Sequence, residues 1–313
     1  MALWTISGNG TLAYVPKVER NASRLIWVDR NGQIEPLSLP PASEYGNPRI
    51  SPSGNQVLFT KLDEKNKLWI YDLDQGRQYR VTDDNGEEWL PVWAPDGKRI
   101  VFNSTRLGGT TGMMFLKPVN EVGGEEVIVK TLWPCPHSWT RDGKLLAYRE
   151  ASTTTAYDIW TITMQGERKA EPFLVTPKDE DWPQFSPDGQ WIAYQSDSSG
   201  QVEVYVLPST AGKSQPIPIS DSGGYHPLWS PDGAELFYMN NNRFMAVPFK
   251  AKPALMVGRP RVLFEVHNVT DTFGYDITPD GKRFIMVEEG EAKSINVVLN
   301  WFEELKRLVP TGK

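Results

Sequence analysis

The stretch Pro227-Leu228-Trp229-Ser230-Pro231-Asp232-Gly233-Ala234-Glu235-Leu236-Phe237-Tyr238 decides the fold, because its central four residues recur along the whole chain. Near copies are Ser186-Pro187-Asp188-Gly189, Ala94-Pro95-Asp96-Gly97 and Thr278-Pro279-Asp280-Gly281, and looser copies are Thr140-Arg141-Asp142-Gly143, Ser51-Pro52-Ser53-Gly54 and Ser7-Gly8-Asn9-Gly10. The seven closing glycines are 44, 43, 46, 46, 44 and 48 residues apart. Self-similarity at such a period indicates a repeat architecture.

Each copy predicts a tight turn between two strands. Proline fixes φ, aspartate bonds its own downstream backbone, and glycine adopts the positive φ that closes the turn. A large apolar residue precedes the turn, as in Pro183-Gln184-Phe185, and an apolar run such as Ile192-Ala193-Tyr194 follows it. We therefore interpret the aspartates as turn-forming residues.

Each unit contains about four strand candidates, and four-stranded antiparallel units with almost no helix are typical of a β-propeller. We predict one all-β domain over residues 1–313 with seven four-stranded blades, six being the alternative, and a short C-terminal helix over 301–309. The predicted blades are 3–39, 46–82, 90–132, 135–176, 182–220, 226–265 and 273–300. The seventh unit lacks a fourth strand of its own, so we expect either an open edge there or partial cover from the helix.

Composition excludes several functional classes. A net charge of -6 and a pI near 5.3 disfavour nucleic-acid binding, which needs a basic surface. No run approaches 18 apolar residues, so no membrane span is expected within this chain. The single Cys135 excludes an internal disulfide and a zinc site built from cysteines.

Candidate catalytic residues are sparse. The chain has no Gly-x-Ser-x-Gly elbow and no glycine-rich phosphate loop. Cys135 and His137 are separated by a proline in an extended segment, which does not direct the thiol toward the imidazole. We expect no cofactor, although a divalent metal at the propeller axis is an alternative. Its candidate ligands are His137, His226, His267, Glu88, Asp181 and Asp271.

The connections from each outer strand to the next inner strand combine acids with aromatic residues. In a propeller these loops surround one mouth of the channel, and acids beside aromatic rings suit a cationic peptide or amine through ion pairing and cation–π contact. The candidate binding residues at this mouth are Glu88, Trp89, His137, Asp181, Trp182, Tyr225, His226 and Phe273.

The Ser-Pro-Asp-Gly turns followed by Ile-Ala-Tyr strands resemble the WD-like propeller repeats of the TolB type. More narrowly, Gly10-Thr11-Leu12-Ala13-Tyr14-Val15-Pro16 and the terminal Leu299-Asn300-Trp301-Phe302-Glu303-Glu304-Leu305 resemble the propeller that follows bacterial Ser/Thr kinase domains, notably in acidobacteria. TolB has six blades, whereas seven turns occur here. The resemblance implies a periplasmic or extracytoplasmic location and a parent protein with a kinase domain and a membrane anchor.

The resemblance implies binding or sensing and supplies no catalytic motif. The sequence therefore favours a non-catalytic scaffold that binds a protein or ligand through the channel mouth. The alternative is a metal-dependent hydrolase or lactonase with its site at the axis, so enzymatic activity stays open.

Overall fold

The computed structural model describes residues 4–8, 10–14, 23–40, 44–62, 65–82, 86–106, 112–121, 123–210, 214–269, 274–290 and 296–308. Within these residues the chain forms six antiparallel sheets in a propeller, a small separate sheet and one short helix. No described helix has both the length and the apolar composition needed to cross a bilayer. The predicted all-β propeller with four-stranded blades is confirmed.

Each blade has four strands, ordered from the axis outward. Blades one to six are numbered in the chain order of their first strands. The first strands are β5 (Glu44–Ile50), β9 (Glu88–Trp93), β13 (Cys135–Trp139), β17 (Glu180–Phe185), β21 (Tyr225–Trp229) and β26 (Asp276–Ile277). The second strands are β6 (Gln56–Leu62), β10 (Arg99–Ser104), β14 (Leu145–Ser152), β18 (Trp191–Ser196), β22 (Glu235–Asn240) and β27 (Arg283–Glu288). The third strands are β7 (Asn66–Asp72), β11 (Gly112–Pro118), β15 (Ala156–Thr163), β19 (Glu203–Pro208), β23 (Arg243–Lys250) and β3 (Arg24–Asp29). The fourth strands are β8 (Arg77–Arg80), β12 (Glu126–Thr131), β16 (Ala170–Leu174), β20 (Ile217–Pro218), β25 (Arg261–Glu265) and β4 (Ile34–Pro36), and blade five also has β24 (Met256–Val257).

The prediction of seven blades is wrong, and the alternative of six is correct. Residues 3–39, expected to form one blade, are divided between two sheets. Strands β3 and β4 complete the last blade, where β3 pairs with β27 from Arg283↔Asp29 to Glu288↔Arg24. The predicted open edge is therefore absent from the described part of this blade, because the N-terminal strands satisfy its hydrogen bonds.

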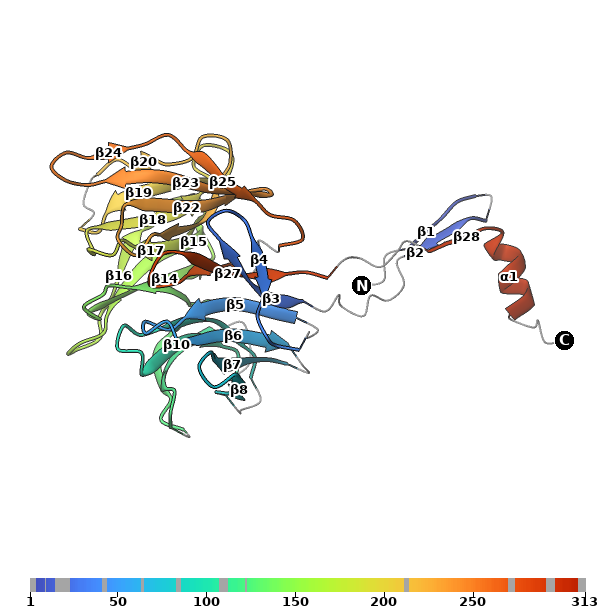
Figure 1. The fold of residues 1–313 in the computed structure, drawn as a ribbon, viewed down its shortest axis with the longest axis horizontal. Coiled ribbons are helices and arrows are strands. Elements are labelled where there is room, and N and C mark those ends of the chain that lie inside the picture. The colour runs from blue at the N-terminus through green and yellow to red at the C-terminus, as the bar shows by residue number, and fades with distance from the viewer. Residues whose placement is uncertain are drawn as a thin grey trace.

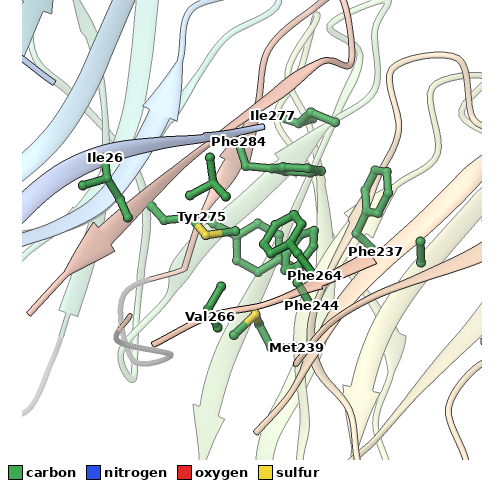
Figure 2. Close-up of a cluster of buried hydrophobic side chains, with 12 residues drawn as sticks. Ile26, Phe237, Met239, Phe244, Phe264, Val266, Tyr275, Ile277 and Phe284 are labelled. Atoms are coloured by element: carbon green, nitrogen blue, oxygen red, sulfur yellow. The ribbon is translucent and has the colours of Figure 1, made fainter. Parts of the chain in front are cut away.

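The joint between blades five and six contains a dense apolar cluster (Figure 2). The ring of Phe244 is fully buried and lies 4.6 Å from the ring of Phe284 and 4.8 Å from that of Tyr275. Ile26, supplied by the N-terminal strand β3, belongs to the same cluster. The ring is thus closed by apolar packing as well as by strand pairing.

The first hairpin of the chain lies outside the ring. Strands β1 (Trp4–Ile6) and β2 (Leu12–Tyr14) pair with β28 (Asn296–Val298), and helix α1 (Trp301–Leu308) follows. Figure 1 shows this appendage apart from the six blades. The backbone amide of Trp301 donates to the carbonyl of Gly10 at 2.7 Å, so the start of the helix is attached to the hairpin turn.

The Asp-Gly turns have the chemistry that the sequence predicts. The hydroxyls of Ser186, Ser230 and Thr278 each donate to the aspartate two residues later at 2.6 Å. That aspartate also accepts a backbone amide beyond the glycine, as Asp232 does from Ala234 at 3.0 Å. These carboxylates are used to hold the turns.

Candidate functional site

The first strands of blades one to five each have a β-bulge. The pairing register shifts by one residue between Gly46 and Arg49, and equivalent shifts occur in blades two to five. A residue within the bulge has a positive φ in four of these blades: Asn47, Leu90, Trp182 and His226, with φ from 48 to 55°. Positive φ is strained for residues other than glycine and is often found where a bulge re-aims side chains.

A cavity of about 340 Å³ lies within the ring. Its wall includes one residue of every blade, five places before the turn glycine: Arg49, Val92, Ser138, Gln184, Leu228 and Asp276. The wall also includes Pro52, Arg141 and Pro279, which are exposed. These residues belong to the turns between first and second strands, and we call this side of the ring the turn face. Arg141 donates to the carbonyl of Pro231 at 2.5 Å, and so connects the turns of blades three and five.

Trp182 of blade four spans the channel. Its ring centroid lies 4.8 Å from that of His137 in blade three and 3.9 Å from that of His226 in blade five. The guanidinium carbon of Arg49, in blade one, lies 6.0 Å from the indole, and a β-carbon on Gly274 of blade six would lie 3.0 Å from it. A side chain that contacts four other blades and is only 8% exposed closes the channel at this level.

The negative charge of Asp181, the residue before Trp182, is balanced by the nearby guanidinium of Arg149. Its Oδ1 lies 3.2 Å from Nε of Arg149 and 3.4 Å from Nε2 of His137. Burial alone would raise the pKa of Asp181, but the guanidinium of Arg149 and then His137 hold it below the ordinary value. Burial lowers the pKa of His137 despite Asp181. The resulting state is an Asp181–Arg149 ion pair beside a neutral imidazole.

His226, which is half-buried, also has a neutral imidazole. Burial lowers its pKa to about 3. Its backbone amide donates to Oε1 of Gln195 at 2.8 Å, and its carbonyl accepts the hydroxyl of Tyr275 at 2.6 Å. The backbone of this bulge is therefore fixed on both sides.

Of the residues that the sequence predicts at the mouth, His137, Asp181, Trp182 and His226 come together around the axis. Glu88 belongs to a separate buried network, in which Nζ of Lys67 lies 3.1 Å from Oε2 and Nη2 of Arg106 lies 3.6 Å from Oε1. Trp89 is half-buried, as is Tyr225, whose hydroxyl donates to the carbonyl of Asn241 at 3.1 Å. Phe273 and Asp271 lie outside the described residues.

The surroundings of Cys135, His137 and His226 limit the chemistry that these side chains can perform. The Cys135 thiol is buried and contacts the carbonyl of Trp133 at 3.5 Å, and burial raises its pKa to about 11. Across the ranges that the structure describes, no three His, Cys, Asp or Glu side chains are arranged to hold a metal ion. His137 and His226 both pack against the Trp182 ring.

Sequence reasoning missed Arg49 and Asp276 as site residues. Both lie on first strands, and both occupy the position five residues before the turn glycine. Aligning the repeats at this position shows Arg, Val, Ser, Gln, Leu and Asp, so the two charged residues stand in blades one and six, which are neighbours in the ring. This alignment of the repeats could have identified Arg49 and Asp276 from the sequence.

Comparisons with known proteins agree on the fold. The chain matches no known family model. It is 27% identical over 169 residues to the uncharacterized peptidase YuxL of Bacillus subtilis, covering 51% of this chain and 24% of that protein. It is 24% identical over 261 residues to dipeptidyl-peptidase 5 of Porphyromonas gingivalis, covering 62% and 37%. The chain thus spans 24% and 37% of the lengths of these two relatives.

Solved structures show the same architecture. A putative TolB from Agrobacterium tumefaciens superposes with a TM-score of 0.70 at 20% identity, covering 87% of this chain and 99% of that one. TolB from Acinetobacter baumannii gives 0.58 at 16% identity, over 88% and 66%. An oligogalacturonate lyase in complex with manganese gives 0.56 at 11% identity, over 90% and 76%. The fold is therefore a TolB-like β-propeller, a fold shared by proteins of different functions.

Proposed function

We propose that this chain is a non-catalytic binding or sensory propeller whose ligand or partner segment occupies the central channel. The observation that supports this most is the cavity, which Trp182 bounds at one end and turn residues line at the other. Its volume of about 340 Å³ lies near the lower end of the range for small-molecule sites, roughly 300–1,000 Å³.

The state of the reactive groups favours binding over catalysis. A nucleophile needs a lowered pKa or an adjacent base, whereas burial raises the pKa of the Cys135 thiol. A general base works best with a pKa near neutrality, whereas that of His226 is lowered to about 3. His137 and Asp181 are occupied with each other and with Arg149.

Filling the channel tests the proposal. Leu228 lines the cavity, so Leu228→Trp should fill it, while Val262→Trp on the outer strand of the same blade is the matched control. A library of metabolites and short peptides is screened by thermal shift against both variants and the wild-type chain. Hits should be lost in Leu228→Trp alone. Hits retained by Leu228→Trp would place binding outside the channel and refute the proposal.

A metal-dependent hydrolase or lactonase is the second candidate, supported by the two imidazoles around the axis and by the fold shared with a manganese-bound lyase. The assay offers lactones, esters and oligogalacturonate with added Mn²⁺ or with chelator. Turnover that is lost with chelator and in His226→Ala, while the circular dichroism spectrum stays unchanged, would replace the binding proposal by this one.

We also propose that a cationic partner binds the face formed by the loops that lead from each outer strand to the next inner strand. Asp179 there has a raised pKa, first through burial and then through repulsion from Asp181 and Asp197, and a bound cation would relieve that repulsion. Binding of an oligolysine peptide should weaken with salt and with Asp179→Asn. The association with a Ser/Thr kinase and an extracytoplasmic location also remain proposals, which the upstream sequence of the parent gene tests.

A further inference from the structure

We infer that the central cavity binds a zwitterionic α-amino acid with an apolar side chain, with the carboxylate on Arg49 and the ammonium on Asp276. The inference rests on the proposed function, since it names the ligand class for the same cavity. It follows from a buried cation, Arg49, and a partly buried carboxylate, Asp276, which both line the cavity without forming an ion pair with each other.

Arg49 is a buried cation with donors to spare. It is 9% exposed, and its Nη1 donates to the carbonyls of Pro48 at 2.9 Å and Tyr275 at 3.2 Å. Within the described part of the chain, Nε and Nη2 make no hydrogen bond and no carboxylate forms an ion pair with Arg49. A guanidinium has five N–H donors, and its planar edge fits a carboxylate. A buried cation without a counter-ion in contact favours an anionic group in the ligand.

Asp276 is the complementary group. Its Oδ2 accepts the amide of Ile50 at 2.7 Å, and its Oδ1 accepts the amide of Ile277 at 2.9 Å. These bonds use one acceptor site on each oxygen, and a carboxylate has about four. Burial raises the pKa of Asp276, while the charge of Arg49 opposes that rise. A ligand ammonium would supply the counter-charge that the carboxylate lacks.

Hydrogen bonds to the backbone hold the two groups at adjacent positions between blades one and six. Arg49 donates to the carbonyl of Tyr275, and the amide of the residue after Arg49 donates to Asp276, so the two bonds bridge blades one and six at adjacent positions. The electrostatic interaction between Arg49 and Asp276 is present without an ion pair. An α-amino acid has its ammonium and its carboxylate bonded to the same carbon, which matches neighbouring partners better than the distant termini of a long peptide do.

Charge balance selects a zwitterion over a singly charged ligand. A carboxylate alone would leave the partly buried Asp276 without a cation in contact, and an amine alone would leave the buried Arg49 without an anion in contact. The imidazoles at the closed end add no charge, because the pKa values of His137 and His226 are lowered by burial. Arg141 at the turn face is already bonded to Pro231.

The rest of the wall suits an apolar side chain. Trp93, Trp139 and Trp182 line the cavity together with Val92 and Leu228. Aromatic rings supply large apolar contact areas. An aromatic or branched aliphatic amino acid would place its side chain against these residues while its two charges engage the blade one–six side.

The test compares L-phenylalanine with two analogues that each lack one charge, N-acetyl-L-phenylalanine and L-phenylalaninamide, by calorimetry on the full chain. Charge-assisted hydrogen bonds are worth about 1.5–3 kcal/mol, so each analogue should bind roughly tenfold to a hundredfold more weakly than phenylalanine. Arg49→Gln should lose phenylalanine binding by a similar factor, and so should Asp276→Asn. Denaturation curves identify any variant that fails to fold, and then the analogue series alone decides.

Equal binding of the three compounds, or no binding at millimolar concentration, overturns this inference. Neither result refutes the proposed function, which fails separately if the filled Leu228→Trp variant keeps the hits of the wild-type chain. Loss of phenylalanine binding in Leu228→Trp, with retention in Val262→Trp, supports both.

Discussion

Replacing Trp182 by alanine should destabilise the ring severely, because this side chain spans the channel. The indole is 8% exposed and contacts His137, His226 and the guanidinium of Arg49. Truncating a buried tryptophan costs about 3–5 kcal/mol. The cation–π contact with Arg49 adds about 0.5–2 kcal/mol within that range. The predicted loss of unfolding free energy is therefore about 4 kcal/mol, toward the upper part of the range.

Trp133 offers a matched control. It is also a tryptophan at positive φ, 45° against 55° for Trp182, but it is 40% exposed. Trp133→Ala therefore introduces the same residue into the same backbone region and should change stability by less than about 0.5 kcal/mol. Urea unfolding followed by far-ultraviolet circular dichroism measures both without relying on tryptophan fluorescence.

The outcome that refutes this reasoning is equal stability of the two variants. If Trp182→Ala lies within about 1 kcal/mol of Trp133→Ala, the indole does not fill the channel. A second readout is rescue: free indole should raise the melting temperature of Trp182→Ala, because it binds the folded state with its cavity, and should leave the wild-type chain unchanged.

Three further predictions concern the pH response, ring closure and the thiol. Burial, and then the charge of Asp158, raise the pKa of Glu180 to about 7, although a hydrogen bond from Thr176 lowers it. The free energy of unfolding should therefore fall as pH rises from about 4.5 to about 7, and Glu180→Gln should remove that fall in urea titrations. An unchanged dependence of stability on pH in the variant would exclude Glu180 as its source. Deleting residues 1–14 should leave the ring's melting temperature unchanged, whereas deleting 1–36, which also removes β3 and β4, should abolish the cooperative transition; equal effects would contradict closure by those strands. Cys135 should not react with a thiol reagent at pH 8 until denaturant is added, because its thiol is buried with a pKa of about 11, and rapid labelling of the native chain would refute that placement.

The recurring turn motif predicted the propeller fold, but counting its copies gave seven blades where the structure has six. The amide of Gly10 donates to the carbonyl of Ser7 between the paired strands β1 and β2, yet a turn motif indicates two adjacent strands and not the sheet that they join. The apolar pattern of Leu25-Ile26-Trp27-Val28 predicts a strand, which the structure has as β3. Its partner β27 is more than 250 residues away, so the identity of that partner follows from ring closure and not from local sequence.

The candidate site was predicted in part for a similar reason. The sequence predicts His137, Asp181, Trp182 and His226 at one mouth of the channel, and in the structure these four side chains contact one another. The sequence did not predict the packing of Trp182 against the two imidazoles, because the positive φ of Trp182 and His226 has no signature in residue type alone. Arg49 and Asp276 needed the repeat alignment, since each alone reads as an ordinary strand residue.

The way in which the ring closes also fixes its mechanical behaviour. Arg24 and Glu288 face each other at the same end of the β3–β27 pair, so a force that pulls on the chain on either side of the ring acts on one end of this antiparallel pair. The hydrogen bonds would then break one after another, as in unzipping, instead of resisting together in shear. Arg24 and Glu288 at that end form a partly exposed ion pair of 3.8 Å, which contributes about 0–1 kcal/mol. Under tension the propeller should therefore open first at its own closing blade, at low force, while the other five blades remain folded.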